Sequence, residues 1–242
     1  EAVDSTLERL GCGHIDLLQV EWPDRYLPHE SQYGFDEMEG RVGAPIAEQL
    51  EAFKTLIDAG KVRNIGLSNE TPYGVGKFLE IAKSENLPKI ISVQNPYNLI
   101  ERNDYESGLA ETCYHEGVEL LAHSPLAGGS LTAKYLGVEQ PEDARMNMFP
   151  GYTARYNMPI VKEAIDEYKK IANFHGLSLT QMALSWCYTR PFVASTIIGA
   201  STVDQLHENL QATNCPLTED MAREIYQVFL KYRDPTKGGA SV

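Results

Sequence analysis

Apolar positions along the chain fall into short, nearly continuous runs that alternate with longer stretches of mixed polarity. The runs are rich in β-branched residues, which is typical of parallel strands covered on both faces. They predict five strands, at residues 14–21, 62–68, 90–95, 118–124 and 194–201.

The stretches between these runs have helical periodicity. Within residues 45–60, four apolar residues share one helical stripe, and Gly60 follows as a residue suited to a left-handed helix end. The stripe consists of Ile46, Leu50, Phe53 and Ile57. A second helix is predicted to begin at Thr71 and Pro72, which suit the cap and the first turn, and to end by Pro88. Strand and helix therefore alternate in a βαβ rhythm.

This rhythm predicts an α/β fold, either a doubly wound sheet or a (β/α)8 TIM barrel. We favour the barrel because no strand is followed by a GxGxxG turn, whereas polar residues recur at the carboxyl ends of the strands. These residues are Glu21, Ser68, Asn69, Gln94, Asn95, His123, Ser124 and Ser201. Strand ends of a barrel converge on one mouth, where active sites lie. No Pro/Gly/Ser-rich linker interrupts the pattern, so residues 1–242 are predicted to form one domain.

Composition narrows the classes of partner. The formal net charge of −13 argues against nucleic acid, which requires clustered Lys and Arg. The four cysteines lie far apart without CxxC spacing or nearby histidines, so neither a metal site nor a disulfide scaffold is predicted. No apolar run approaches membrane-spanning length. We therefore expect a cytoplasmic protein that contacts neither nucleic acid nor membrane, of unknown oligomeric state.

Residues 3–232 resemble the aldo-keto reductases, barrel enzymes that reduce carbonyls with NADPH. The stretches that carry the resemblance, in matching order and spacing, are "STLERLGCGHIDLLQVEWPD", "AGKVRNIGLSN", "ISVQNPYN", "LLAHSPLAGG", "LTAKY" and "IIGASTVDQLHENL". The "QNPYNLI" form is also similar to the β-subunits of voltage-gated potassium channels. The resemblance implies an NADP-dependent oxidoreductase domain that acts on a small carbonyl or enone.

The resemblance implies specific roles at the nicotinamide end of the coenzyme. Ser68, Asn69 and Gln94 are expected to hold the nicotinamide carboxamide, because such side chains both donate and accept hydrogen bonds. His123 stands where the family usually stacks an aromatic residue, often Tyr, on the nicotinamide ring.

Further roles are implied along the phosphates and the adenosine. Ser124, Pro125 and Leu126 begin the loop that follows the pyrophosphate, and Lys134 and Arg145 are expected to face phosphate groups. The residues implied around the adenosine are Gly199, Ser201, Gln205, Glu208 and Asn209. A helix that starts near Thr202 would point its amide groups at a phosphate. From spacing alone, residues 205–209 are equally compatible with an ordinary polar helix face.

Glu21 replaces the histidine of the family's usual "HWPD" sequence, since this chain reads "EWPD". The steroid 5β-reductases show a similar replacement and reduce a double bond conjugated to a carbonyl. A desolvated, protonated carboxyl could donate a hydrogen bond to the substrate oxygen. We therefore expect Glu21 to be catalytic. The alternative is that Glu21 marks a non-reductase relative or a reductase of altered efficiency.

The family's catalytic Asp, Tyr and Lys come from its second and third strands and the segment after the second, and no counterpart is assigned here. The first predicted strand resembles the family's fourth, and the chain begins with Glu1. We therefore expect a C-terminal portion that lacks the first three strands, a partial barrel of strands 4 to 8. Whether the chain is an enzyme stays open, with two alternatives: a coenzyme-binding regulatory subunit or an inactive truncated chain. The sequence also leaves open whether NADPH or NADH is preferred.

Overall fold

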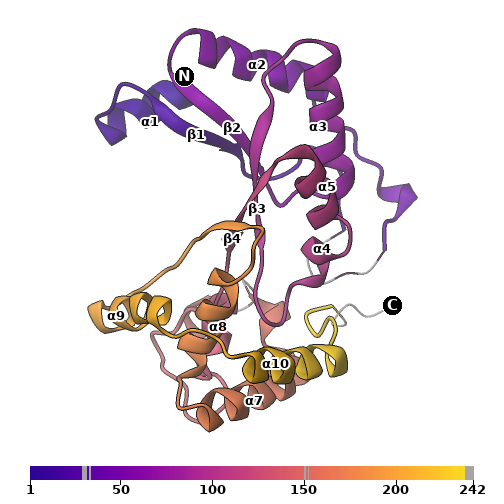
Figure 1. Cartoon of the computed structure of the whole chain (residues 1–242). Helices are drawn as coiled ribbons and strands as arrows, with labels where there is room; N and C mark the ends of the chain where they lie inside the picture. The colour runs from indigo at the N-terminus through magenta and orange to yellow at the C-terminus, as the bar shows by residue number, and fades with distance from the viewer. Residues whose placement is uncertain (29–31, 33, 150, 152, 238–242) are drawn as a thin grey trace. The chain divides into compact units, whose positions relative to one another are not determined.

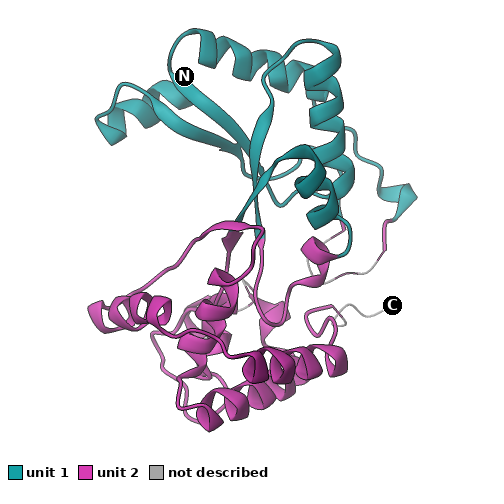
Figure 2. Cartoon of the chain, in the orientation of Figure 1, with its two compact units in different colours: residues 1–27, 36–95, 107–121 teal, residues 28–35, 96–106, 122–242 magenta. Residues whose placement is uncertain are grey.

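The computed structural model describes residues 1–28, 32, 34–149, 151 and 153–237 (Figure 1). The chain divides into two compact units, coloured separately in Figure 2. Unit 1 contains residues 1–27, 36–95 and 107–121, and unit 2 contains residues 28–35, 96–106 and 122–242. The prediction of a single domain stays a prediction, and each unit is described by itself below.

Five strands form one sheet in the order in which they occur along the chain. They are β1 (Ile15–Val20), β2 (Val62–Ser68), β3 (Ile90–Pro96), β4 (Glu119–His123) and β5 (Val193–Thr196). β1 pairs with β2, and β2 with β3, in parallel. The predicted α/β fold with a parallel sheet is therefore confirmed, as are the strand order and the places of β1 and β5 at the ends. Closure into a (β/α)8 barrel and the numbering of the strands as 4 to 8 stay predictions.

The last strand is shorter than predicted. β5 ends at Thr196, so Ser201 does not lie at the end of a strand. One further backbone bond joins the Ile197 amide to the Ala122 carbonyl, and the chain then leaves the sheet. The carbonyl of Gly199 accepts a hydrogen bond from the side chain of Asn209 and not from a strand. A side chain of the following helix thus satisfies the backbone where continuous β pairing was expected.

Unit 1 packs its helices against β2 and against one another. The helices are α1 (Ala2–Leu10), α2 (Ile46–Asp58), α3 (Pro72–Ser84), α5 (Leu109–Glu116) and the short 3₁₀ helix η1 (Glu37–Glu39). α2 contacts β2 and α3, and α3 contacts α5. Both helices predicted in this part of the chain are present. Thr71 caps α3 as predicted, because its hydroxyl accepts a hydrogen bond from the Gly74 amide.

The predicted apolar stripe of α2 is only partly buried. Leu50 is fully buried, whereas Ile46, Phe53 and Ile57 are half-buried. The core of unit 1 lies mainly in the sheet and α3, where Ile65, Leu67 and other large side chains are shielded from solvent. Periodicity therefore identified the inward face of α2, but not how completely that face is covered.

Unit 2 is mainly helical. Its α-helices are α4 (Asn103–Glu106), α6 (Arg145–Met148), α7 (Pro159–Phe174), α8 (Leu179–Tyr188), α9 (Val203–Gln211) and α10 (Glu219–Lys231). The 3₁₀ helices are η2 (Ala127–Thr132), η3 (Ala154–Tyr156) and η4 (Ala212–Asn214). α8 is the central helix: it contacts α7, α9, η2 and β5, and all of its residues from 179 to 187 except Gln181 are buried. The Trp186 ring stacks on Tyr97 at 4.9 Å between ring centroids.

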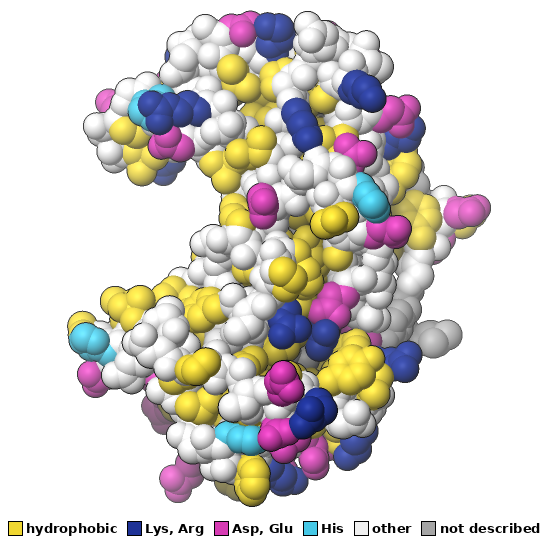
Figure 3. Space-filling view, in the orientation of Figure 1, with side chains coloured by type: hydrophobic (Ala, Val, Ile, Leu, Met, Phe, Trp, Pro, Cys, Tyr) yellow, Lys and Arg dark blue, Asp and Glu magenta, His cyan; other side chains and the backbone are white. Residues whose placement is uncertain are grey.

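The surface carries charges of both signs. On the face drawn in Figure 3, acidic and basic side chains are interspersed, without a continuous basic patch. Among the helices that the structure describes, none is both long enough and apolar enough to span a membrane.

Candidate functional site

Three residues predicted to bind the nicotinamide lie together in unit 1, at the carboxyl ends of β2 and β3. The Ser68 hydroxyl and the Asn69 amide donate hydrogen bonds to the Gln94 carbonyl, at 2.9 and 3.0 Å. The Asn69 side chain donates to the Ser68 hydroxyl and, at 2.9 Å, to the Glu21 carbonyl. Asn69 has a φ of 57°, a left-handed conformation that Asn tolerates better than most residues. The ends of β1, β2 and β3 are therefore linked by hydrogen bonds in unit 1. The convergence of all five strand ends on one barrel mouth stays a prediction.

Glu21 follows β1 and its side chain is exposed. The hypothesis of a protonated carboxyl requires burial, and the structure does not bury this side chain. Its backbone carbonyl, in contrast, is fixed by Asn69. The catalytic role of Glu21 stays a prediction, without support from burial.

A buried ion pair, which the sequence analysis missed, joins the loops that follow β1 and β2. The Arg25 guanidinium donates to both carboxylate oxygens of Glu70, at 2.8 and 2.7 Å, and the Thr71 amide donates to the same carboxylate. Glu70 is only 4% exposed. The backbone amide and carbonyl of Glu70 are both paired with the side chain of Asn95. Gly74 is required beside the pair, since a Cβ there would lie 1.9 Å from a Glu70 oxygen.

Unit 2 contains a cavity of about 650 Å³, which is within the usual range for small-molecule sites. Eleven of the residues predicted to bind the coenzyme line it, together with eleven other residues. The predicted ones are His123, Ser124, Pro125, Leu126, Lys134, Arg145, Gly199, Ser201, Gln205, Glu208 and Asn209. Three stretches of sequence, near residues 125, 140 and 203, and Thr180 are thus brought to one concave surface. We call it the unit 2 pocket.

One wall of the unit 2 pocket is a turn in left-handed backbone conformations. Ser124 and Ala127 have φ values of 54° and 49°, and Gly128 and Gly129 continue the turn with positive φ. Non-glycine residues rarely adopt such angles, and they concentrate at functional sites. The side chain of Asn98 supports the turn by donating to the Ser124 carbonyl at 3.0 Å. The strain at Ser124 is therefore held by a buried partner.

Lys134 and Arg145 are the basic residues of this pocket, and neither forms a salt bridge with any residue that the structure describes. Gly129 provides room for Lys134, because a Cβ at Gly129 would lie 2.7 Å from the lysine Cε. The acidic lining residues are Asp143 and Glu208, and Glu208 accepts a 2.6 Å hydrogen bond from Ser178. Two unpaired cations in one cavity suit an anionic ligand, especially a phosphate.

The loop after β5 is held against α9 by residues that were predicted to contact the adenosine. The Asn209 side chain donates to the Gly199 carbonyl at 3.1 Å, and the Gln205 side chain accepts from the Ser201 amide at 2.8 Å. Thr202 caps α9 by accepting from the Gln205 amide, which confirms the predicted helix start. Asn209 and Gln205 therefore hold the loop after β5 against α9, whether or not they also contact a ligand.

His123 lies at the end of β4, where it is half-buried and lines the unit 2 pocket. Its Nδ1 atom lies 3.0 Å from the Ser124 hydroxyl. Burial lowers the pKa of His123 to about 4, and the charge of Arg155 acts in the same direction. The imidazole is consequently neutral at physiological pH.

Several lining residues carried no sequence signal. Thr180 lies in the first turn of α8 and reaches the pocket because α8 packs against α9. Asp143 lies in a loop with no recognisable motif. Tertiary packing brings such residues to the pocket, and the periodicity of the sequence does not predict it. Among the residues that the structure describes, no group of three potential metal ligands was found.

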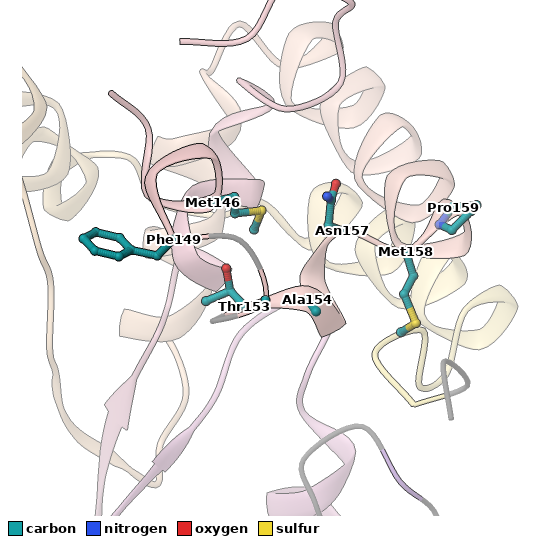
Figure 4. Close-up of a pocket in the computed structure, with 8 residues that line it drawn as sticks. Met146, Phe149, Thr153, Ala154, Asn157, Met158 and Pro159 are labelled. Atoms are coloured by element: carbon teal, nitrogen blue, oxygen red, sulfur yellow. The ribbon is translucent and has the colours of Figure 1, made fainter. Parts of the chain in front are cut away.

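Unit 2 also contains a smaller cavity of about 400 Å³, shown in Figure 4. Met146, Phe149 and Met158 supply apolar and thioether surface, and Thr153 and Asn157 supply polar groups. The Thr153 hydroxyl is buried and has no hydrogen-bond partner in the described structure. None of the predicted site residues lines this cavity.

Comparisons with known proteins show which family the sequence matches. The sequence profile of the aldo/keto reductase family matches residues 1–229, nearly the whole chain. A Babesia bovis protein named aldo-keto reductase is 41% identical over 250 residues, which cover 98% of this chain and 88% of that protein. Protein tas of Escherichia coli is 41% identical, covering 97% of this chain and 67% of the relative. L-glyceraldehyde 3-phosphate reductase of Escherichia coli is 32% identical, covering 88% and 57%. The expectation of a C-terminal portion without three strands gains no support from these matches.

Proposed function

The chain belongs to the aldo/keto reductase family, and from this premise we propose that it is an oxidoreductase that uses NADP(H) to reduce a carbonyl or a conjugated double bond. The observation that carries the proposal is the unit 2 pocket, which places two unpaired cations beside a glycine-containing turn and the amino end of α9. A dinucleotide phosphate is the ligand class that such a combination fits. The coenzyme would supply the hydride.

The pocket residues suggest a division of roles along the coenzyme. Lys134 and Arg145 are proposed to neutralise phosphate charge, and the turn that begins at Ser124 is proposed to follow the pyrophosphate with its backbone. Glu208 is proposed to accept hydrogen bonds from the adenosine, where Ser178 fixes its carboxylate. Ser68, Asn69 and Gln94 are proposed ligands of the nicotinamide carboxamide, because their amide and hydroxyl groups are already clustered in unit 1.

The test of the proposal is a fluorescence titration with NADPH. Lys134→Met and Arg145→Met are each expected to weaken binding by tenfold or more, since a hydrogen bond to a charged group contributes about 1.5–3 kcal/mol. The matched control is Lys170→Met, because Lys170 is exposed, lies on α7 and pairs with Asp166 outside the pocket. Equal affinities of all four proteins would remove the phosphates from this pocket.

The regulatory alternative is not better supported than the reductase proposal. Consumption of NADPH distinguishes the two. A reductase oxidises NADPH when a carbonyl or enone is added, whereas a regulatory subunit or an inactive chain binds the coenzyme without consuming it. Loss of NADPH absorbance at 340 nm with an aldehyde or enone is therefore the second measurement. Binding without consumption would favour the regulatory alternative.

A further inference from the structure

Residues 69–71 link β2 to α3, and we call them the β2–α3 link. Its backbone is bonded to the end of β3 at two successive positions. The Asn69 amide donates to the Gln94 carbonyl at 3.0 Å. The Glu70 amide donates to the Asn95 side chain at 3.1 Å, and that side chain donates back to the Glu70 carbonyl at 2.8 Å. Glu70 and Asn95 are at most 5% exposed, so these bonds are shielded from water.

The Glu70 side chain ties the same link to the loop after β1. Its carboxylate accepts two hydrogen bonds from the Arg25 guanidinium and one, at 2.9 Å, from the Thr71 amide. Arg25 also donates to the Thr71 hydroxyl at 3.1 Å. Arg25 lies in the loop that begins at Glu21. One buried carboxylate therefore connects the loop after β1 with the β2–α3 link.

The link begins with a residue in an unfavourable backbone conformation. Asn69 has a φ of 57°, in the left-handed region that L-residues other than glycine seldom adopt. Such a conformation persists only where the surrounding structure over-determines it. On one side of Asn69, the Ser68 hydroxyl is bonded to Gln94, and on the other side Glu70 is held by its side chain and its backbone. These bonds therefore keep Asn69 in the left-handed conformation.

Helix α3 leaves space for the Glu70 carboxylate because residue 74 is a glycine. A Cβ at Gly74 would lie within 2.6 Å of three atoms of that carboxyl group. An alanine at this position would therefore displace the carboxylate from Arg25 and Thr71. A Cβ at Gly76, on the same helix, would meet no atom of the described structure within 4 Å.

From this arrangement, and resting on the proposed function, we propose that Arg25, Glu70 and Asn95 are positioning residues of the site that binds the nicotinamide carboxamide. They hold the β2–α3 link in the conformation in which Ser68 and Asn69 present their polar groups. They act on the coenzyme only through that link. When the Glu70 carboxylate is displaced, Asn69 relaxes toward common backbone angles, and a hydrogen bond to the carboxamide is lost.

The first test compares Gly74→Ala with Gly76→Ala, the same substitution at two positions of α3. Calorimetry measures the affinity for NADPH and for 2′-phospho-ADP-ribose, which is the coenzyme without its nicotinamide. Gly74→Ala is expected to bind NADPH about threefold to tenfold more weakly, the value of one hydrogen bond, and to bind 2′-phospho-ADP-ribose as the unaltered protein does. Gly76→Ala is expected to bind both ligands normally. If Gly74→Ala loses affinity for both ligands, or for neither, the proposal is overturned.

A second variant removes the ion pair itself, so that the result does not depend on one substitution in α3. Arg25→Met combined with Glu70→Gln leaves no unpaired buried charge, and for that reason it is expected to fold. The matched control is Arg63→Met combined with Asp16→Asn, which removes an exposed ion pair that also joins β1 to β2. The first double variant is expected to show the loss that is specific to NADPH, and the control to show none. Equal affinities of the two double variants for NADPH contradict the proposal.

Hydrogen–deuterium exchange, followed by NMR, tests the β2–α3 link in the free protein. The Asn69 and Glu70 amides donate to groups at the end of β3, so they are expected to exchange slowly in the unaltered protein. In Gly74→Ala and in the double variant that removes the buried ion pair, both amides should exchange about tenfold faster or more, whereas amides of α7 keep their rates. Unchanged exchange at residues 69 and 70 rejects the positioning role, as does equal acceleration throughout the chain.

The affinities also separate this proposal from the proposed function. If the unaltered protein binds neither NADPH nor 2′-phospho-ADP-ribose, the proposed function fails, and the positioning role, which rests on it, fails with it. If the unaltered protein binds both ligands and Gly74→Ala keeps the same ratio of the two affinities, the proposed function stands and the positioning role alone is wrong.

Discussion

At the scale of single residues, the structure separates polar side chains that have partners from those that do not. Thr71 and Thr153 illustrate the difference: the Thr71 hydroxyl caps α3 and accepts a bond from Arg25, whereas the buried Thr153 hydroxyl has no partner in the described structure. A buried polar group without a partner loses its hydration without compensation, so it lowers stability.

This contrast leads to opposite expectations for the same substitution. Thr71→Val should lower the free energy of unfolding by about 1–2 kcal/mol, because a helix cap is lost. Thr153→Val should cause no loss and a gain of up to about 1 kcal/mol, because an uncompensated hydroxyl is removed. Urea denaturation followed by circular dichroism measures both. A loss in Thr153→Val as large as that in Thr71→Val would show that the Thr153 hydroxyl has a partner.

Glu21 is tested by kinetics, because its proposed effect is on the choice of reaction. The hypothesis predicts that the protein reduces an activated double bond in preference to a plain aldehyde, and that Glu21→His shifts the ratio of kcat/KM values toward the aldehyde. Glu8→His is a suitable control, since Glu8 is an exposed residue of α1. The Glu21 side chain is exposed. An unchanged ratio of kcat/KM values would show that this residue does not select the reaction.

At the scale of secondary-structure elements, the ends of the elements are fixed by side chains that come from elsewhere in the sequence. α3 shows this most clearly. The Glu70 carboxylate accepts the Thr71 amide at the amino end of the helix, where a negative charge is favourable, and Arg25 neutralises it from the loop after β1. The pKa of Arg25 is raised, chiefly by its hydrogen bonds to Glu70.

Removing the arginine alone should therefore be costly. Arg25→Met leaves the Glu70 carboxylate buried and unpaired, which is expected to lower stability by about 3–5 kcal/mol. Arg63→Met removes an exposed pair with Asp16 and should cost less than about 1 kcal/mol. Chemical denaturation compares the two variants under identical conditions. Similar losses of stability in the two variants would mean that the buried pair contributes no more than the exposed one.

At the scale of the whole molecule, acid stability depends on groups that resist protonation in the folded state. His123 is such a group, since burial holds its pKa at about 4, below the ordinary histidine value of 6.5. The unfolded chain then binds more protons than the folded protein between these two values. Stability contributed through His123 is complete above pH 6.5 and is lost as the pH falls toward 4.

His123→Gln removes this titration and leaves the rest of the pocket in place. Between pH 6.5 and pH 4.5 the variant should lose less stability than the unaltered protein, by about 2 kcal/mol, because each pKa unit of separation corresponds to about 1.4 kcal/mol. Urea denaturation midpoints at pH 4.5, 5.5 and 6.5 measure the difference. Parallel pH profiles for the two proteins would show that His123 does not carry this dependence.

Local patterns along the chain determined much of this architecture. The β2 strand was predicted at its observed bounds, Thr71 was identified as a helix cap, a helix was expected to start near Thr202, and the sheet follows the predicted strand order. Strands and helix caps depend on continuous apolar runs or on backbone amides one helical turn away, and each of these signals lies within a few consecutive residues. The resemblance to a family then pointed to pocket residues because whole stretches, such as residues 199–209, keep their order and spacing.

Tertiary structure alone decided which side chains meet across long separations in sequence. Arg25 pairs with Glu70, 45 residues away, and Arg155 pairs with Glu101, 54 residues away. Many exposed carboxylates are equally available to an arginine in the unfolded chain, and only packing selects the partner that is buried beside it. For the same reason the sequence marked Glu21 as chemically interesting but did not determine its burial, and it gave no sign that Arg155 would act on His123. Spacing along the chain specifies local geometry, whereas burial and charge partners emerge from the assembled fold.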